Sequence, residues 1–300
     1  MSQPSSITRS EIVPRSVERV PEARALECLV EARRNPRPLL FEGIGSRWPA
    51  LRRWTIAYLK TTVGEMRVPI KSFSGAAPST LMTSFADYAD GLVDSNPGGP
   101  REPYLHDFPL FLRAPALCAD VEPFPSYLLP AFYRDEWWRF AQFFLGPTGM
   151  VTPLHFDCLE THNLFFQVIG RKQFTLVDRD DLQYCYRSGW RWFDVDPEAP
   201  DLDAHPDFRR VSPWQTIVGP GDALFIPSRV GHHVRSLDVS VSFNVDWHTS
   251  RTALLAAFGP LRGMPVRNAY YSAVCAVGLV LRLPSRWLFP LYRSYLTYVS

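Results

Sequence analysis

The N-terminal third of the chain alternates between a helical hydrophobic period and short apolar runs. Leu26, Leu29 and Val30 recur at the spacing of one helix face, and Pro36 ends that pattern. The whole region predicts, in chain order, a helix over 17–34, a strand over 37–44, a helix over 54–64, a strand over 67–73 and a helix over 85–94.

From about Trp137 the pattern changes to short apolar runs separated by Gly, Pro and Asp. The two-residue period is clearest over 239–247, where Val, Phe and Trp share one face of a strand and Ser, Asn and Asp share the other. Many short strands without helices between them favour a barrel or sandwich over a parallel α/β sheet. The runs predict strands over 137–146, 163–170, 172–178, 214–219, 223–227, 232–237 and 239–247.

These patterns indicate one β-rich domain with additions at its ends. Residues 1–15 are polar and are predicted to be flexible. Residues 16–250 are predicted to form the domain, with its barrel core over about 137–250 and a polar, proline-containing insertion over 187–210. Residues 251–300 return to the helical period and are predicted to form a C-terminal extension.

The C-terminal extension is unusually apolar. The runs 252–261, 269–281 and 286–299 are apolar over most of their turns, so helices there must bury more than one side. We therefore expect a homodimer through these helices, the alternative being that they cover one another. The run at 269–281 is shorter than the roughly 20 residues that a membrane-spanning helix needs, so no transmembrane segment is expected.

Composition narrows the class of protein. The formal net charge is only +2 and Lys and Arg form no block, so nucleic acid is not an expected partner. The five cysteines are scattered without a CxxC pair, which argues against a zinc knuckle or a disulfide framework. The N-terminus lacks the apolar core of a signal peptide, so we expect a reducing, cytoplasmic location.

Two His-x-Asp pairs occur in the chain. His155 and Asp157 lie two apart within TPLHFD, so on a strand both side chains project from the same face. His205 and Asp207 form the second pair, in a Pro- and Asp-rich stretch that is typical of a surface loop. Only the first pair is therefore a candidate for metal binding.

A third metal ligand is available in the apolar strand region that contains the consecutive His232 and His233. Two imidazoles and one carboxylate leave open positions on the metal and are typical of non-haem iron(II) oxygenases. Neighbours on a strand point to opposite sides, so only one of the two is the ligand, and spacing does not choose between them. The alternative is that these are ordinary strand histidines.

At these residues the sequence resembles the cupin-like branch of the JmjC oxygenases, the group that contains the factor-inhibiting asparaginyl hydroxylase. The resemblance spans about residues 37–250. It is carried in order by RPLLFEGIGSRWPALRRW, YLHDFPLF, TPLHFD with NLFFQVIGRKQFTL, and GDALFIPSRVGHHVRSLDVSVSFNVDW. It implies a double-stranded β-helix, that is, a jelly-roll or cupin barrel, with N-terminal helices packed on it and the helical extension following.

The resemblance also implies a ligand set and a cosubstrate. His155, Asp157 and His232 would hold Fe(II), and Lys172 would pair with the far carboxylate of 2-oxoglutarate. The residues that would share or line the cosubstrate pocket are Thr152, Tyr104, Asn163 and Asn244. The sequence itself agrees for Lys172, because a lysine among apolar strand neighbours needs an anionic partner; the alternative is a solvated lysine at the strand end.

Two departures from the family pattern affect details. The spacing between the first metal pair and Asn163 is longer than usual, so Thr161 or His162 is an alternative in its place. Gly231, preceded by Val230, stands where the family has a tryptophan, which is expected to loosen the pocket wall.

The expected activity is hydroxylation of a C–H bond coupled to decarboxylation of 2-oxoglutarate, most favourably on a protein or peptide side chain. Alternatives are hydroxylation of a small metabolite or natural-product intermediate, demethylation of N-methyl-lysine, and a non-catalytic metal-binding cupin. A dicarboxylate clamp at Lys172 and Thr152 argues against the last, because a purely structural metal site does not need one.

Overall fold

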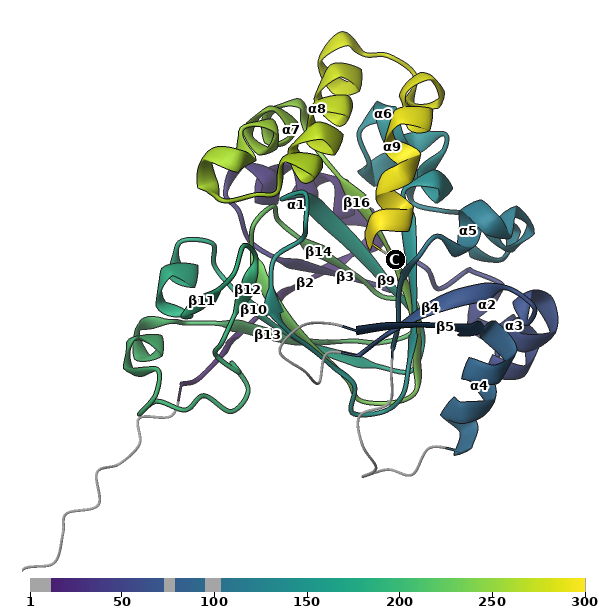
Figure 1. The fold of residues 1–300 in the computed structure, drawn as a ribbon, viewed down its shortest axis with the longest axis horizontal. Coiled ribbons are helices and arrows are strands. Elements are labelled where there is room, and N and C mark those ends of the chain that lie inside the picture. Colours follow the sequence, from purple (N-terminus) through teal and green to yellow (C-terminus); the bar gives the residue numbers. More distant parts are fainter. Residues whose placement is uncertain (1–11, 73–78, 95–103, 300) are drawn as a thin grey trace, which may run out of the picture.

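The computed structural model describes residues 12–72, 79–94 and 104–299, in which two β-sheets lie face to face and helices cover one face and one end (Figure 1). The sequence had predicted flexibility over 1–15; residues 1–11 lie outside the described part, and Arg15–Ser16 form a short strand, β1. The mainly β jelly-roll arrangement with added helices confirms the predicted fold class.

One sheet has seven strands, in the order β1, β13, β10, β15, β8, β12, β11. The other has nine strands, in the order β2, β3, β14, β9, β16, β7, β6, β4, β5. The strands are β1 (Arg15–Ser16), β2 (Glu18–Pro21), β3 (Leu39–Glu42), β4 (Arg67–Ser72), β5 (Ser79–Ser84), β6 (Tyr104–Phe108), β7 (Ala141–Gly146), β8 (Val151–His155), β9 (His162–Ile169), β10 (Lys172–Val177), β11 (Arg187–Ser188), β12 (Trp192–Phe193), β13 (Trp214–Val218), β14 (Ala223–Ile226), β15 (Gly231–Ser236) and β16 (Ser240–Trp247).

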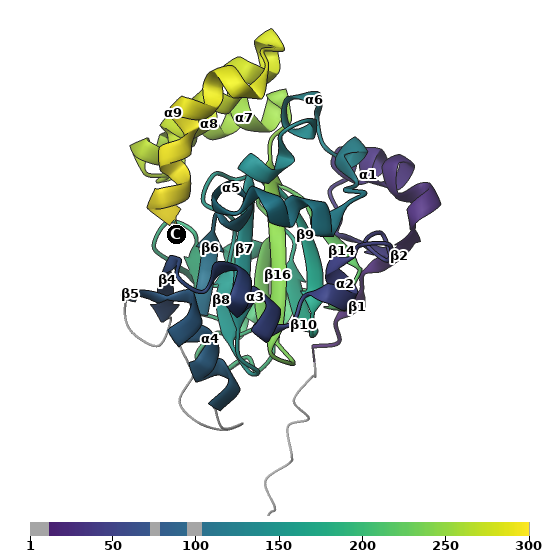
Figure 2. The same ribbon diagram turned by 90° about the vertical axis from the view of Figure 1, so that its right-hand side faces the viewer.

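Nine α-helices lie within the described residues, most of them on the outer side of the nine-stranded sheet or at its end (Figures 1 and 2). They are α1 (Ala25–Arg34), α2 (Ala50–Arg53), α3 (Ile56–Val63), α4 (Phe85–Asp94), α5 (Leu110–Arg113), α6 (Ala131–Arg134), α7 (Ser250–Ala257), α8 (Val266–Leu281) and α9 (Ser285–Val299). In Figure 2 α7, α8 and α9 stack together at one end of the sheets, and the chain ends near β6.

The central strands of the nine-stranded sheet are buried on both faces. Along β16, Val241, Phe243 and Val245 pack into a large aromatic cluster that the N-terminal helices cover. The alternate residues of the same strand point into the space between the two sheets, yet all eight positions of β16 are buried. Phe165 of β9 and Phe174 of β10 belong to the smaller apolar cluster that fills part of that space.

The first predicted helix is wrong at its start. Instead of a helix from Val17, residues Glu18–Pro21 form β2, which pairs in parallel with β3, and a 3-10 turn over Glu22–Arg24 leads into α1. The physical reason is Pro21, which lacks an N–H and is tolerated before a helix but not inside one. Likewise the predicted strand over 137–146 begins only at Ala141, after a 3-10 turn.

The other predicted elements are confirmed with small shifts at their ends. The helix predicted over 54–64 begins at Ile56, where Thr55 caps it by accepting a hydrogen bond from the Tyr58 N–H at 3.0 Å, and Gly64 follows its last residue. The strand predicted over 67–73 ends at Ser72, and Phe73 lies outside the described residues. The insertion over 187–210 contains the short ribbon β11–β12, which extends the seven-stranded sheet.

Two chemical expectations concern cysteines and membranes. All five cysteines carry free thiols. Among the helices of the described residues, none combines the length and apolar character required to cross a lipid bilayer.

We expect Phe243→Ala to lower the free energy of unfolding by about 3–5 kcal/mol, because it empties the centre of the aromatic cluster. Phe243 is fully buried, with ring centroids of Phe111 and Phe166 each 5.0 Å away. Ile217→Ala is the control: Ile217 is 44% exposed on β13, and its loss should cost well under about 1 kcal/mol. Urea unfolding followed by circular dichroism measures both, and equal costs would contradict the assignment of this cluster as the main core.

Candidate active site

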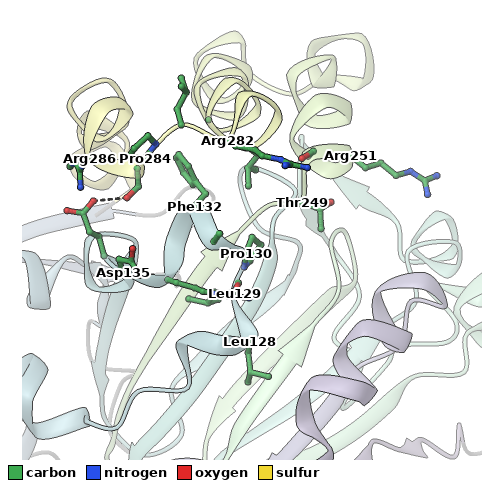
Figure 3. Close-up of a pocket in the computed structure, with 18 of the residues that line it drawn as sticks. Leu128, Leu129, Pro130, Phe132, Asp135, Thr249, Arg251, Arg282, Pro284 and Arg286 are labelled. Carbon is green, nitrogen blue, oxygen red and sulfur yellow. Dashed lines mark hydrogen bonds between the residues drawn. The ribbon is translucent and has the colours of Figure 1, made fainter.

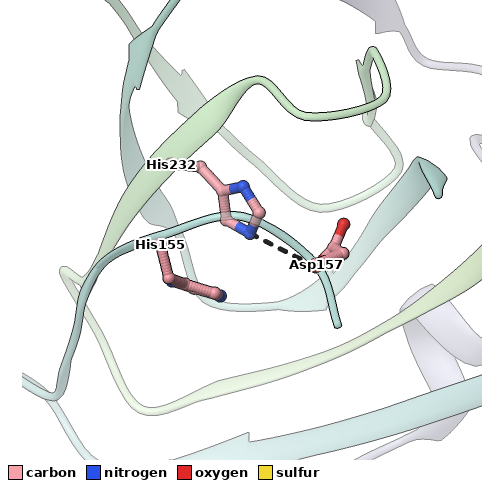
Figure 4. Close-up of side chains that lie close together, drawn as sticks. All are labelled: His155, Asp157 and His232. Carbon is pink, nitrogen blue, oxygen red and sulfur yellow. Dashed lines mark ion pairs between the residues drawn. The ribbon is translucent and has the colours of Figure 1, made fainter. Parts of the chain in front are cut away.

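Three potential metal ligands converge between the sheets (Figure 4). His155 is the last residue of β8, Asp157 follows in the next loop, and His232 lies opposite His155 on the paired strand β15. One side-chain atom of each lies within 4.8 Å of the others. β8 ends at His155, so Asp157 lies in the loop just beyond the strand, but its carboxylate faces the same side as His155, as expected.

The alternation of β15 separates the two consecutive histidines. His232 Nε2 lies 3.6 Å from Asp157 Oδ1. His233 points to the opposite side, where its ring nitrogens lie 3.6 Å from Asp196 and 3.7 Å from Glu198 of the insertion. The geometry therefore favours His232 over His233 as the third ligand.

Both histidines of the cluster have their Nε2 atom available to bind a metal. His155 Nδ1 lies 2.7 Å from the Pro153 carbonyl oxygen, and His232 Nδ1 lies 3.3 Å from the Val230 carbonyl oxygen. A carbonyl oxygen only accepts, so Nδ1 carries the hydrogen and the lone pair of Nε2 remains for a metal. Burial, followed by the nearby His232 and Arg191, lowers the pKa of His155 well below its usual value, which keeps this ring neutral. Neutral imidazoles with a carboxylate are the donor set that Fe(II) oxygenases use, so the residues present fit that metal.

Lys172 is a buried cation with polar but uncharged partners. It is 1% exposed, and its Nζ donates to the hydroxyl oxygens of Tyr104 at 2.7 Å and Ser242 at 3.0 Å. The ring of Phe144 also lies close, with its centroid 5.3 Å from Nζ. Burial lowers the pKa of Lys172 to about 7. Within the described residues no carboxylate pairs with it, so an anionic ligand would satisfy a charge that the chain leaves unbalanced.

The structure brings all of the predicted site residues to one small cavity of about 50 Å³ between the sheets. Asn163 is on its wall, whereas the neighbouring His162 faces the other side of β9, with its ring 4.6 Å from that of Trp247. Asn163 also donates to Asp157 Oδ2 at 3.3 Å. The lining residues that the sequence had singled out are Tyr104, Thr152, His155, Asp157, Asn163, Lys172, His232 and Asn244.

Sequence reasoning missed several neighbours of this cavity. Ser242 was not singled out, although the two-residue period of its strand places it on the same face as Asn244. A charged cluster was also missed: Asp107 Oδ2 lies 2.7 Å from His106 Nδ1 and 3.1 Å from Lys71 Nζ, and both His106 and Asp107 line the cavity. Burial would raise the pKa of Asp107, but the charges of His106 and Lys71 outweigh it and lower that pKa.

The buried Asp246 is another missed group. It accepts a hydrogen bond from Asn244 Nδ2 at 3.1 Å. Burial, followed by the charges of Asp157 and Asp107, raises the pKa of Asp246 well above the usual value, which favours the neutral form of this carboxyl.

The insertion reaches the candidate metal ligands. Trp192 pairs with His155 across β12 and β8, and its ring centroid lies 4.7 Å from that of His155. The guanidinium of Arg191 stacks 4.2 Å from the Trp192 centroid and donates to the Phe156 carbonyl oxygen at 3.2 Å. Aromatic and cationic groups therefore border the metal ligands.

The expected loosening of the wall at Gly231 is wrong. A Cβ added at Gly231 would lie 2.6 Å from Cδ2 of Leu182, a residue of the turn after β10. Leu182 therefore occupies the space that the smaller residue leaves. The second His-x-Asp pair stays apart from the cavity: Asp207 is exposed, and His205 packs against Tyr186 with ring centroids 4.7 Å apart.

Comparison with known proteins agrees with this geometry. The profile of the cupin-like domain family matches residues 25–253. Over 223 residues the chain is 32% identical to lysine-specific demethylase 8 of Danio rerio, covering 70% of this chain and 53% of that protein. It is 29% identical over 220 residues to Jumonji C domain-containing protein 5 of Drosophila melanogaster, covering 70% and 54%. It is 26% identical over 232 residues to tRNA wybutosine-synthesizing protein 5 of Homo sapiens, covering 70% and 71%.

The chain spans about half the length of the first two relatives. Members of the matched family use Fe(II) and 2-oxoglutarate, and His155, Asp157 and His232 can bind such a metal. From the family profile, these relatives and the clustered ligands, the chain belongs to the cupin-like JmjC family of Fe(II)- and 2-oxoglutarate-dependent oxygenases.

Proposed function

We propose that this protein hydroxylates a C–H bond of a protein or peptide side chain, with His155, Asp157 and His232 as the iron ligands. The observation that carries the proposal is that one cavity holds both the three clustered ligands and the buried Lys172. A metal site alone would be compatible with a structural role. A buried ammonium group on the wall of the same cavity, bonded only to hydroxyls in the described chain, is what a dicarboxylate cosubstrate requires.

Each residue of the cavity has a role in this proposal. Lys172 pairs with the far carboxylate of 2-oxoglutarate, and the hydroxyls of Tyr104 and Thr152 share that carboxylate. Asn163 orients the Asp157 carboxylate through its side-chain amide. When bound, iron with 2-oxoglutarate and dioxygen supplies the oxidising power, while the barrel excludes water and fixes the geometry.

The aromatic and cationic side chains beside the metal ligands support a side chain of a larger molecule as the substrate. Trp192 and Arg191 lie on the insertion beside the metal ligands, where they could contact a peptide that reaches the cavity. A small metabolite or natural-product intermediate is the alternative, which the same loops could enclose.

Demethylation of N-methyl-lysine is a second candidate, because two relatives carry the name lysine-specific demethylase 8. It begins with the same hydroxylation, directed at an N-methyl group.

Two measurements on the purified protein separate these possibilities. One is succinate release from 2-oxoglutarate, with and without iron and ascorbate. The other is mass spectrometry of products formed in a peptide library and a cell lysate. Addition of one oxygen supports hydroxylation and loss of a methyl group supports demethylation, whereas no succinate under any condition would favour a non-catalytic cupin.

We also propose that residues 16–250 form the oxygenase domain and that the extension from 251 makes a homodimer. The outward faces of the extension carry exposed apolar side chains, including Leu261 at 86%, Val266 at 76% and Trp287 at 62% exposure. A surface so apolar is rare on a monomer, and a two-fold partner is the commonest way to cover it.

We expect iron binding to require His155, Asp157 and His232 but not His233. An alanine at any of the three removes a bond to the metal and should weaken iron affinity by about a hundredfold or more, since even the loss of a residue that orients a ligand costs about 10–100-fold. His233→Ala, the matched control on the opposite strand face, should keep its iron. Metal content by mass spectrometry checks this, and retention by His232→Ala with loss by His233→Ala would reverse the assignment.

Lys172→Ala should raise the apparent constant for 2-oxoglutarate by about a hundredfold, on the order of 3 kcal/mol, because the far carboxylate would be buried without a partner. Iron content should not change. Lys60→Ala is the control, since Lys60 is exposed and pairs with Asp90 at 2.6 Å away from the cavity. An unchanged constant in Lys172→Ala would assign the clamp to another residue.

The affinity for 2-oxoglutarate should fall as pH rises above about 7. Burial lowers the pKa of the free Lys172 to about 7, and a bound carboxylate favours the charged form, so binding takes up a proton above that pH. Below pH 7 the lysine is already charged and this dependence disappears. Isothermal titration in buffers of different ionisation enthalpy measures the proton uptake, and none at pH 8 would contradict a lysine clamp with this pKa.

Intact protein should be a dimer at micromolar concentration by light scattering, and a truncation ending near Arg251 should be a monomer. Val280→Glu places a charge on an outward position of α8 that is 49% exposed and should also give a monomer. Leu26→Glu, at a 47% exposed position of α1, is the matched control and should stay dimeric. A monodisperse monomer of the intact chain would end the dimer proposal.

A further inference from the structure

A second pocket, of about 540 Å³, lies on the other side of β9 from the metal cavity. The two cavities share no lining residue: Asn163 faces the metal cavity and the adjacent His162 faces the second pocket. Six arginines and one carboxylate, that of Glu160, line this second pocket, which we call the arginine pocket. The arginines are Arg33, Arg34, Arg179, Arg229, Arg251 and Arg262.

The positive charge of the arginine pocket is not balanced by the described chain. The carboxylate of Glu160 is 3% exposed and pairs with two arginines. Arg229 lies 3.5 Å from its Oε1, and Arg262 lies 2.7 Å from its Oε2. Among the described residues, Arg179 forms an ion pair only with the solvent-exposed Asp180, at 3.5 Å.

The remaining three arginines, Arg33, Arg34 and Arg251, form no ion pair with any residue in the ranges that the structure describes. Burial and the charge of Arg34 lower the pKa of Arg33, as expected where cations crowd. The pocket therefore has an excess of positive charge.

The walls of the pocket are held by a connected set of bonds. Ser228 donates its N–H to His162 Nδ1 at 3.0 Å and its hydroxyl to the Glu160 carbonyl oxygen at 2.5 Å. Glu160 and Arg229 have φ values of 56° and 64°, a left-handed conformation that costs roughly 1–2 kcal/mol in a non-glycine residue. The fold thus fixes the buried Glu160, whose carboxylate lies 3.5 Å from Arg229, while Arg33, Arg34, Arg179 and Arg251 are exposed around it.

A neighbouring cleft of about 820 Å³ adjoins the arginine pocket (Figure 3). It shares Arg33 and Arg251 with the arginine pocket. Its lining also includes two carboxylates, Asp135 and Glu136, and three further arginines, Arg134, Arg282 and Arg286. In Figure 3 the Arg251 side chain extends away from Asp135. The excess of positive charge is therefore greatest in the arginine pocket, where six arginines meet a single carboxylate.

We propose that the arginine pocket binds a compact polyphosphate group. Guanidinium groups match phosphate oxygens through paired N–H donors, and several of them converging on a small volume suit a ligand with several adjacent negative charges. The backbone adds to this field, because Arg251 lies in the first turn of α7, whose N-terminus carries partial positive charge. The floor consists of the loop that follows Asp157 and the loop that precedes His232, yet binding here needs neither iron nor turnover.

The test uses the full chain and tripolyphosphate as the probe, in metal-free buffer because this probe chelates iron. Titration calorimetry should show saturable binding at one site per chain that weakens with added salt. In the double variant Arg34→Gln/Arg251→Gln, affinity should fall by about tenfold or more, as the loss of two charge-assisted contacts predicts. Both side chains are exposed, so the variant is expected to fold, and its thermal melting curve checks this.

The matched control is Arg24→Gln/Arg52→Gln, which removes the same charge from exposed positions outside the pocket and should change affinity less than about twofold. Two further probes identify the source of the polyphosphate. A nucleoside triphosphate that binds as tightly as tripolyphosphate supports a free nucleotide. Tighter binding of an oligonucleotide with a 5′-triphosphate supports a nucleic-acid end. Absence of saturable binding, equal losses in the two double variants, or tightest binding of a 5′-hydroxyl oligonucleotide would each overturn the proposal.

Discussion

Both faces of the central strands of the nine-stranded sheet are buried, so the side chains on each face need packing or bonding partners, and the rest of the structure follows from that constraint. Side chains alternate across a strand, so one set must pack against the helices while the other fills the space between the sheets. On β16 the apolar set enters the aromatic cluster, and Ser242, Asn244 and Asp246 enter the interior. Polar groups buried there need partners, which is why they gather around one cavity and bond to each other and to Lys172.

The electrostatics of the cavity are complementary to a metal ion with an anionic chelator. Burial lowers the pKa of His155 and raises that of Asp246, so it favours the neutral form of both side chains. Asp157 then supplies a negative charge at the metal side, while Lys172 supplies the cation at the other. On a third side of the cavity, the carboxylate of Asp107 pairs with Lys71 and His106, which largely balances its charge.

A single strand, β9, divides the two binding regions of this molecule. Its alternate residues Asn163 and His162 face the metal cavity and the arginine pocket, respectively. The loops at its end connect both: the one that bears Asp157 continues to Glu160, and the one that bears Ser228 continues to His232. A charged ligand in the arginine pocket would therefore contact the same loops that position the metal ligands.

The sequence by itself determined a barrel or sandwich of short strands, the strands that carry the site and the candidate metal ligands, because a two-residue period and local motifs are encoded within a few positions of one another. The resemblance to the cupin-like JmjC oxygenases added the jelly-roll class and the cosubstrate residues. The sequence by itself also indicated that His232 and His233 must point apart, but not which one faces the metal. The tertiary structure places His232 beside His155 and Asp157, as the resemblance implied. It alone gave the partners of Lys172, the filling of the space at Gly231 by Leu182 and the loop position of Asp157 after its strand ends. The arginine pocket could not be predicted for the same reason: its six arginines come from five separate segments, and charges that are scattered along a chain meet only when loops and helices fold against each other.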